Sequence, residues 1–245
     1  MSIKQYLNTK TISAAVLILF LLFWLIGVYW SVEPDTFDVR QSVAATAENP
    51  TQTEVPGYTV TTTLILVTEH MLDKPGGYLS NDVMPPGLFL DNIPAWEYGA
   101  LEMIRDLSLS MRKDFSRSQS QSIESPNLTK AQPEFNVNSR SWALPSAESS
   151  YRNGIKALKA YRAELVDPTR GDGQFYTRAD NLRDWLKQVE KRLGSYSQRL
   201  SASVGSSRMN TDLAGDKNAR QSTPTVNEKV VKNVILEDSI LKRKF

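Results

Sequence analysis

Histidine and cysteine are the residues in shortest supply in this chain. It contains no cysteine and a single histidine, His70, among 245 residues. Without cysteine it forms neither disulfides nor thiolate sites, a composition that suits an oxidising compartment. Zinc sites with an open catalytic position and Ser-His-Asp arrangements usually need histidine, so all such chemistry would depend on one imidazole. We therefore predict no metal site, no cofactor and no catalytic residue, and we expect His70 to be exposed or to cap a helix.

Two motifs of common enzymes are also missing. There is no Gly-x-Ser-x-Gly elbow to present a nucleophilic serine, and no Gly-x-x-x-x-Gly-Lys loop to hold phosphates. Charge is nearly balanced, with 29 Lys and Arg against 27 Asp and Glu and a net charge of +2. Such a balance lacks the basic surface that binds nucleic acid. We predict no nucleic-acid partner and favour a protein without catalysis.

A long apolar segment, in contrast, is present near the N-terminus. Residues 12–30, ISAAVLILFLLFWLIGVYW, carry no charge. As a helix they would span about 28 Å, close to the thickness of a bilayer's hydrocarbon core. A cleaved signal peptide is the alternative, but its apolar region is usually only about 7–15 residues long. We interpret residues 12–30 as a retained transmembrane signal-anchor in contact with the lipid bilayer.

The charges on the two sides of this segment differ. Lys4 and Lys10 precede it, whereas one basic and three acidic residues follow it closely: Glu33, Asp35, Asp38 and Arg40. The positive-inside rule places the basic side in the cytoplasm. Residues 1–11 are then a cytoplasmic tail. Residues 31–245 lie outside, which for an inner-membrane protein of a bacterium is the periplasm.

The remainder of the chain divides into three parts by composition. Residues 31–57 are rich in Ser, Thr, Ala, Glu and Pro, and we expect a spacer there. Residues 58–204 carry helical patterns and are expected to form a helical periplasmic domain. Residues 205–245 combine a Gly-, Ser- and Asn-rich stretch, expected to be a disordered linker, with an atypical C-terminal tail.

Apolar spacing and capping residues predict four helices in the domain. They cover about 58–73, about 92–115 with Asn92 as N-cap, about 147–166 with Ser146 as N-cap, and about 180–200. The first includes the β-branched run TVTTTLILV, which leaves a strand open as an alternative. No strand pairing is visible elsewhere. The predicted fold class is mainly α, with one N-terminal transmembrane helix, a bundle of about four helices and a long Pro/Gly-rich loop.

The last of these patterns is the most regular. Its apolar residues alternate in steps of four and three, which is the spacing of a bundle or coiled-coil seam: Leu182, Leu186, Val189, Leu193, Tyr196 and Leu200. Trp185 widens the stripe, which favours packing within a bundle. The seam would serve an intramolecular bundle or a homodimer equally well, so a homo-oligomer stays open.

The loop between the first two predicted helices holds the candidate site residues. It runs from 74 to 97, KPGGYLSNDVMPPGLFLDNIPAWE, and long loops without regular structure are often functional. Six side chains are candidates for a ligand or partner surface: Lys74, Tyr78, Asp82, Asp91, Trp96 and Glu97. The aromatic rings would form walls and the carboxylates polar anchors. The other interpretation, which we favour, is a packed Ω-loop whose prolines and aromatic residues fix its path.

These features lead to two functional hypotheses. The first is a non-enzymatic tether, scaffold or interaction protein of the envelope, which presents its helical domain to an envelope protein or a cell-wall component. The second is a ligand- or glycan-binding module, hydrolytic in one version, that uses Asp82, Asp91 and Glu97. Three carboxylates that converge in a concave pocket would favour the second hypothesis. A filled loop interior would favour the first.

Several segments resemble a known family, in the same order along the chain. They are KPGGYLSND (74–82), PPG (85–87), DNIPAWEYG (91–99), RKDFSRSQSQS (112–122), RADNL (178–182) and SQRLSASVG (197–205). The family they resemble is a proteobacterial inner-membrane family, domain of unknown function 2333. The resemblance implies a single-pass inner-membrane protein with a periplasmic helical domain, and it implies no particular activity.

The C-terminal part departs from the family pattern. Family members continue with a further helical stretch, whereas here the resemblance fades near Val231 and NVILEDSILKRKF does not match the expected continuation. We interpret the chain as truncated at its C-terminus, for instance by a frameshift. This interpretation predicts exposed apolar positions on the seam of the last helix and low order after residue 204.

Overall fold

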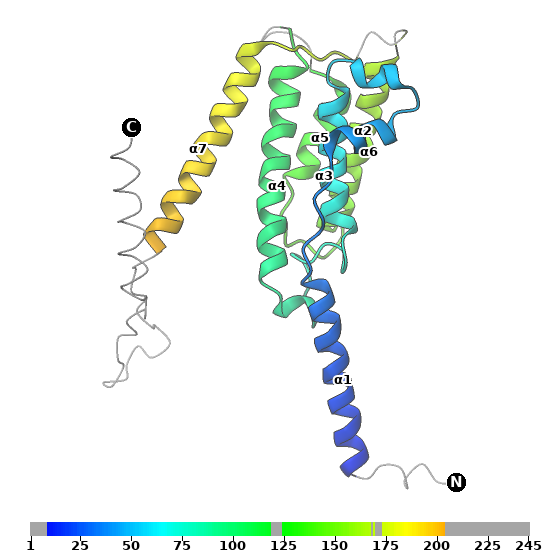
Figure 1. The fold of residues 1–245 in the computed structure, drawn as a ribbon, viewed down its shortest axis with the longest axis vertical. Coiled ribbons are helices and arrows are strands. Elements are labelled where there is room, and N and C mark those ends of the chain that lie inside the picture. Colours follow the sequence, from blue (N-terminus) through cyan, green and yellow to red (C-terminus); the bar gives the residue numbers. More distant parts are fainter. Residues whose placement is uncertain (1–8, 119–123, 168, 170–172, 204–245) are drawn as a thin grey trace. The chain divides into compact units, whose positions relative to one another are not determined.

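The structure, a computed structural model, describes residues 9–118, 124–167, 169 and 173–203. Within these residues it contains helices and no strand, which confirms the mainly α fold, and the run TVTTTLILV is helical (Figure 1). The described elements are α1 Thr9–Trp30, α2 Val39–Thr46, η2 Pro50–Glu54, α3 Tyr58–Asp73, η3 Gly87–Phe89, α4 Asn92–Ser110, the π-helical turn η4 Met111–Phe115, α5 Pro126–Phe135, α6 Ala147–Val166 and α7 Ala179–Ser203.

From Ile12 to Trp30, helix α1 is apolar on every face. Over Thr11–Trp30 its mean hydropathy is 2.6 and only 6% of the stretch is buried. In the part of the chain that the structure describes, it is the one helix long and apolar enough to cross a membrane. Its exposed side chains, such as Phe20 at 67%, distinguish it from the core helix of a globular domain. Its length and composition fit a membrane anchor or a signal sequence.

The segment that we expected to be a spacer, residues 31–57, contains regular structure. The Asp38 carboxylate accepts a hydrogen bond from the Gln41 N–H at 2.7 Å and so caps the start of α2. Val43 on α2 is buried, and both α2 and η2 contact α3. The part of this segment from α2 to η2 is therefore folded against α3.

Four helices enclose the hydrophobic core. Helix α3 contacts α4 and α6, and α5 contacts α4 and α6. Apolar side chains from all four meet in one cluster, which includes Leu64, Ile65, Met71, Leu101, Ile104, Leu128, Phe135, Tyr151 and Leu158. Helix α5 was not predicted from the sequence, although Ser125 caps it through the Leu128 N–H and Pro126 occupies its first turn.

The two predicted N-caps have different outcomes. Ser146 caps α6 as predicted, because its hydroxyl accepts a hydrogen bond from the Ser149 N–H at 3.2 Å. The prediction for α4 was wrong by one residue, since Asp91 occupies the cap position and Asn92 is the first helical residue. The Asn92 amide instead donates to Ser31, at the end of α1.

By its contacts the chain separates into two units, Met1–Trp185 and Leu186–Phe245. Helix α7 runs across this boundary, and of the second unit the structure describes residues 186–203. Trp185 packs against the core cluster of the first unit. The leucines of the predicted seam are exposed instead: Leu182 by 47%, Leu186 by 50%, Leu193 by 57% and Leu200 by 69%. Residues 204–245, for which we expected low order, lie outside the described residues.

Helices α5 and α6 approach closely where Gly154 faces Phe135. Phe135 is fully buried, and a Cβ built on Gly154 would lie 2.6 Å from its ring atom Cζ. That is far too short for an ordinary contact between carbon atoms. Gly99 in α4 also lies inside a helix, but a Cβ there would meet no atom within 4 Å. The two glycines are therefore a matched pair.

Replacing each of these glycines with alanine should change stability in opposite directions. Gly99→Ala should raise the free energy of unfolding by up to about 1 kcal/mol, because alanine is the better helix former. Gly154→Ala gains the same propensity but must displace the buried Phe135 ring, so we expect a net loss of about 1–3 kcal/mol. Urea unfolding of the full-length protein in detergent, followed by circular dichroism, measures both. Equal effects of the two substitutions would contradict the close packing of α5 on α6.

Candidate functional site

The loop between α3 and α4 is organised around one buried carboxylate. Glu97, in the second turn of α4, is completely buried, and a buried carboxylate is costly unless it is paired and hydrogen-bonded. Its Oε1 accepts hydrogen bonds from the Leu79 N–H at 2.8 Å and from Lys74 Nζ. Its Oε2 accepts from the Ser80 N–H at 2.8 Å and from the Ser80 hydroxyl. The carboxylate thus gathers the first part of the loop onto α4.

Lys74 supplies the opposite charge. Its side chain is as fully buried as that of Glu97, and its ammonium group also donates to the carbonyl oxygens of Met71, at 3.2 Å, and Gly77. An ammonium group has three hydrogens to donate, and these three acceptors use all of them. Because both charges are buried, paired and hydrogen-bonded, they hold the loop in place and present no surface to a ligand.

Tyr78 and Trp96 also face the interior. Tyr78 is 2% exposed, its ring meets that of Tyr151 edge to face, and its hydroxyl donates to the Ser139 carbonyl at 3.1 Å. Burial raises the pKa of Tyr78 far above its ordinary value, so the hydroxyl stays protonated. Trp96 is half-buried and packs against the core cluster. Four of the six candidate residues therefore fill or pack against the loop interior.

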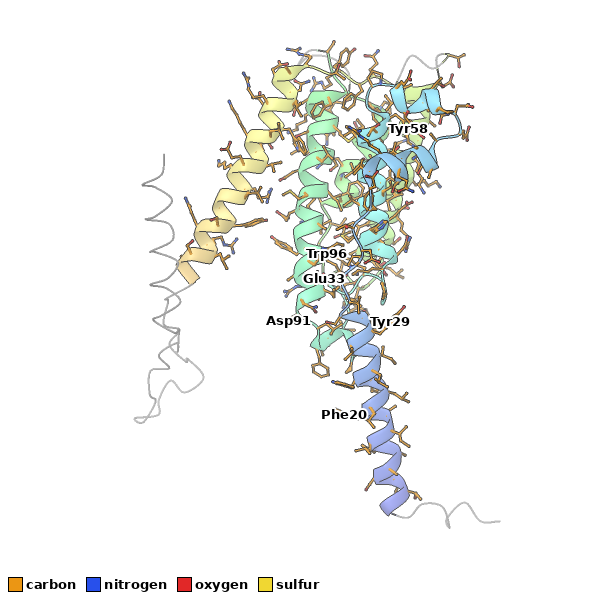
Figure 2. All side chains as sticks on the ribbon, viewed as in Figure 1. Phe20, Tyr29, Glu33, Tyr58, Asp91 and Trp96 are labelled. Atoms are coloured by element: carbon orange, nitrogen blue, oxygen red, sulfur yellow. The ribbon has the colours of Figure 1, made fainter. Side chains whose placement is uncertain are left out.

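The remaining two candidates, Asp82 and Asp91, line an open cleft of about 660 Å³. Figure 2 labels Asp91 at the start of α4 and Trp96 farther along the helix. The walls come from the loop, from the first turns of α4 and from the segment before α6. The principal polar lining residues are Ser80, Asn81, Asp82, Asp91, Tyr98 and Arg140. Its volume lies within the range of about 300–1,000 Å³ that is usual for ligand sites.

Asp82 lies against the glycine of the Pro-Pro-Gly sequence. A Cβ built on Gly87 would overlap the Asp82 side chain, so only glycine admits the carboxylate at this place. Partial burial is the main cause that raises the pKa of Asp82 above its ordinary value. The negative charges of Glu148 and Glu97 raise it further, and Lys74 opposes them. A carboxylate held where its charged form is disfavoured is typical of functional sites.

Sequence reasoning missed several residues of this cleft. Tyr98 lines the cleft and is 52% exposed. In the sequence it is an aromatic residue that lies off the apolar stripe of α4, and this feature could have identified it as a surface residue of the site. Ser139 and Arg140 come from a distant segment. The Asn81 amide donates to the Ser141 carbonyl at 3.1 Å and so helps to hold that segment at the loop. No sequence pattern indicates this long-range contact.

The cleft does not have the arrangement that hydrolysis by three carboxylates would need. Asp82 and Asp91 line it, whereas Glu97 does not line it and is hydrogen-bonded to Lys74 and Ser80. Among the described residues, no three His, Cys, Asp or Glu side chains are grouped so that they could hold a metal ion. His70 lies elsewhere, with its ring 4.7 Å from that of Phe37. The cleft offers polar and aromatic contacts suited to binding.

The end of α1 packs against the same loop. The Trp30 ring covers Gly76, where a Cβ would lie 2.7 Å from the indole and where φ is +85°, so close approach and backbone conformation both favour glycine. The Asn92 amide donates to the carbonyl oxygen of Ser31 at 3.1 Å and to its hydroxyl at 2.9 Å. The apolar helix, the loop and the start of α4 are therefore tied together.

Removing one partner of the buried ion pair should destabilise the protein strongly. Glu97→Gln keeps the size of the side chain but leaves the buried Lys74 ammonium without its counter-charge. We expect the free energy of unfolding to fall by about 3–5 kcal/mol. The double change Lys74→Met with Glu97→Gln removes the buried charge as well and should recover part of this loss. Urea unfolding of the full-length variants measures both effects.

An exposed ion pair on the same bundle is the matched control. Arg152 and Asp73 lie 2.8 Å apart, with side chains 53% and 55% exposed. Asp73→Asn should therefore change the free energy of unfolding by less than about 0.5 kcal/mol. If Glu97→Gln had an effect as small as this control, the organising role of the buried pair would be refuted.

Comparison with known proteins assigns the chain to a family. Neither a curated protein nor a solved structure matches the chain. A family model, described as an uncharacterized protein conserved in bacteria, matches residues 2–238, which extends past Val231, where we expected the resemblance to fade. The matched range includes the segments that enclose Glu97 and line the cleft. Since the match covers nearly the whole chain, the protein belongs to this bacterial family, DUF2333.

Proposed function

We propose that the chain is a single-pass inner-membrane protein of the bacterial envelope, and that it acts without catalysis as a tether or scaffold. In this proposal α1 is a retained anchor. The cleft that contains Asp82 and Asp91 is the surface that binds an envelope protein. Confinement near the membrane raises the effective concentration of the helical domain for its neighbours there, so a modest intrinsic affinity is sufficient.

One observation carries this proposal: the anchor and the cleft share a common support. Trp30 at the end of α1 packs on Gly76 of the loop, and Ser31 accepts hydrogen bonds from Asn92. Asn92 directly follows Asp91 of the cleft. A partner in the cleft would therefore be held at a fixed height above the membrane. A flexible spacer between anchor and cleft would not give this geometry.

The orientation follows from the charges that flank α1. The residues before it include Lys4 and Lys10, and those after it include Glu33, Asp35 and Asp38. The positive-inside rule supports an N-terminus in the cytoplasm and a helical domain in the periplasm. The absence of cysteine suits that oxidising compartment.

Retention of α1 in the mature protein is the first testable consequence. Because a span of about 20 apolar residues is stable in a bilayer, the full-length protein should stay in the membrane pellet after alkaline carbonate extraction. A variant in which a cleavable export signal replaces residues 1–30 should be released with the periplasmic fraction. The intact mass of the membrane-bound protein should still include Ile12–Trp30. Recovery of a soluble chain that begins after Trp30 would identify a cleaved signal peptide and contradict the anchor.

Contact of the cleft with a protein partner is the second consequence. A photo-crosslinking phenylalanine derivative at Tyr98, in the cleft, should give a discrete protein adduct in intact cells. The same derivative at Lys156, which is exposed on α6 and outside the cleft, is the matched control and should give none. Asp82→Asn, introduced with the Tyr98 probe, should reduce the yield of the adduct several-fold because it removes a charged contact. Equal adducts from both positions, or none from either, would count against the tether.

A glycan or another ligand of the cell wall is the second candidate for the cleft. Its favouring observation is the combination of an exposed aromatic ring, Tyr98, with the carboxylates of Asp82 and Asp91 in a cavity of ligand size. Binding of the full-length protein to isolated peptidoglycan, weakened by Tyr98→Ala, together with an absence of protein adducts in cells, would favour this candidate over a protein partner.

A further inference from the structure

The loop from Val83 to Leu90, here named the apolar loop, exposes many large apolar side chains. Four of them are more than half exposed: Val83 by 56%, Met84 by 73%, Leu88 by 56% and Phe89 by 77%. No charged residue lies between Asp82 and Asp91. Single exposed apolar side chains are ordinary, but a contiguous group of them marks a surface that contacts another apolar phase.

The apolar loop lies against the last turns of α1. Its η3 turn contacts α1, and a Cβ built on Gly27 would meet Pro86 at 3.4 Å, an ordinary van der Waals distance. The loop and the helix together enclose an apolar groove of about 570 Å³. The large side chains of its walls are Phe20, Phe23 and Trp24 from α1 and Pro85, Pro86 and Phe89 from the loop. Figure 2 labels Phe20 on α1, well before Tyr29 along the helix.

The position of the groove along α1 gives its depth. It extends from Ser31 back to Phe20, which at about 1.5 Å per residue is roughly 16 Å of helix. Half of a bilayer's hydrocarbon core is about 15 Å thick. If α1 spans the membrane, the apolar loop beside it reaches into the leaflet from which the helix emerges.

The backbone of the apolar loop is suited to such a medium. Pro85 and Pro86 have no N–H group to satisfy. Three later N–H groups donate to carbonyl oxygens of the same loop. Leu88 donates to Met84 at 3.1 Å, Phe89 to Pro86 at 3.0 Å and Leu90 to Gly87 at 3.0 Å. Irregular backbone is costly in lipid mainly because its polar groups lack partners, and this turn removes most of that cost.

The surroundings of the loop resemble a membrane interface. The charged residues Asp82 and Asp91 border the loop on its two sides. The hydrogen bonds from Asn92 to Ser31 hold the second of these borders at the level where α1 ends. Trp142 is 66% exposed and lines a shallow depression together with Trp30 and the loop. Tryptophan and tyrosine concentrate at membrane–water interfaces, where an apolar ring and a polar group can both be accommodated.

We infer that the apolar loop is a second membrane contact, which enters the outer leaflet beside α1 and whose groove is filled by lipid acyl chains. This inference rests on the proposed function, because it requires α1 to be a membrane anchor. Two contacts fix the tilt and rotation of the domain, which one helix cannot do. Since Leu88 and Leu90 also line the cleft, the cleft is then held at the level of the lipid headgroups.

The absence of native cysteine makes a direct test practical. Single cysteines in the full-length protein are labelled with the environment-sensitive fluorophore NBD, at Phe89 in the loop, at Leu22 in α1 and at the exposed Ala163 on α6 as control. The proteins are reconstituted in vesicles of phosphatidylethanolamine and phosphatidylglycerol. Iodide in water and nitroxide groups on the acyl chains then quench each probe. Because an anion is excluded from hydrocarbon, iodide quenching at position 89 should be at least about fivefold weaker than at position 163, with strong nitroxide quenching.

The probe at position 22 separates the two possible failures. If position 22 is quenched by nitroxide lipids while position 89 is as open to iodide as position 163, the anchor stands and the membrane contact of the loop is refuted. If iodide reaches position 22, the anchor fails and this inference fails with it. Met84→Cys repeats the loop measurement at a second exposed position. Circular dichroism that matches the unmodified protein shows that each labelled variant is folded.

Discussion

The burial of the Glu97 charge is the constraint on which the rest of the candidate site depends. A carboxylate placed in the core of a bundle must find a counter-charge and hydrogen-bond donors, or the fold loses several kcal/mol. Lys74 provides the charge from the end of α3, and the backbone of Leu79 and Ser80 provides two donors. These contacts fix the loop on both sides of its first turn. The direction in which the chain leaves that turn then places Asp82 in the cleft and the apolar loop beside α1.

This arrangement explains why a loop so rich in glycine and proline has one defined path. Gly76 admits the Trp30 ring and Gly87 admits the Asp82 carboxylate, so two of the glycines are required by close approach. The loop is thus the joint between the apolar helix and the bundle as well as one wall of the cleft. A shift of α1 would move the loop wall of the cleft, and a shift of that wall would act on α1, because the same contacts join them. In the function that we propose, binding in the cleft and the position of the protein in the membrane would be coupled through this loop.

Local patterns in the sequence predicted what depends on local physics. The unbroken apolar run of α1, the periodic stripe of α4 and the Ser146 cap of α6 are signals carried by neighbouring residues, and all three elements are present. The pairing of Lys74 with Glu97 joins two helices across a loop, and Arg140 reaches the cleft from another segment. Such contacts arise only when the helices pack, so spacing could not reveal them. Helix α5 was missed because Pro133 within it masks a periodic pattern.

Helix α7, helix α1 and the apolar loop all expose large apolar side chains. Their charged residues decide which of them can be covered by lipid. Helix α7 exposes the leucines of its seam, but Asp184, Lys187 and Glu190 lie on its other faces, so it cannot enter lipid without burying charge. Helix α1 has no charged residue from Thr11 to Trp30, and the apolar loop has none between Asp82 and Asp91. Of these three surfaces, the last two carry no charge, and hydrocarbon disfavours charged groups. Because they adjoin along one groove, a membrane anchored by α1, as we propose, would cover both surfaces at once.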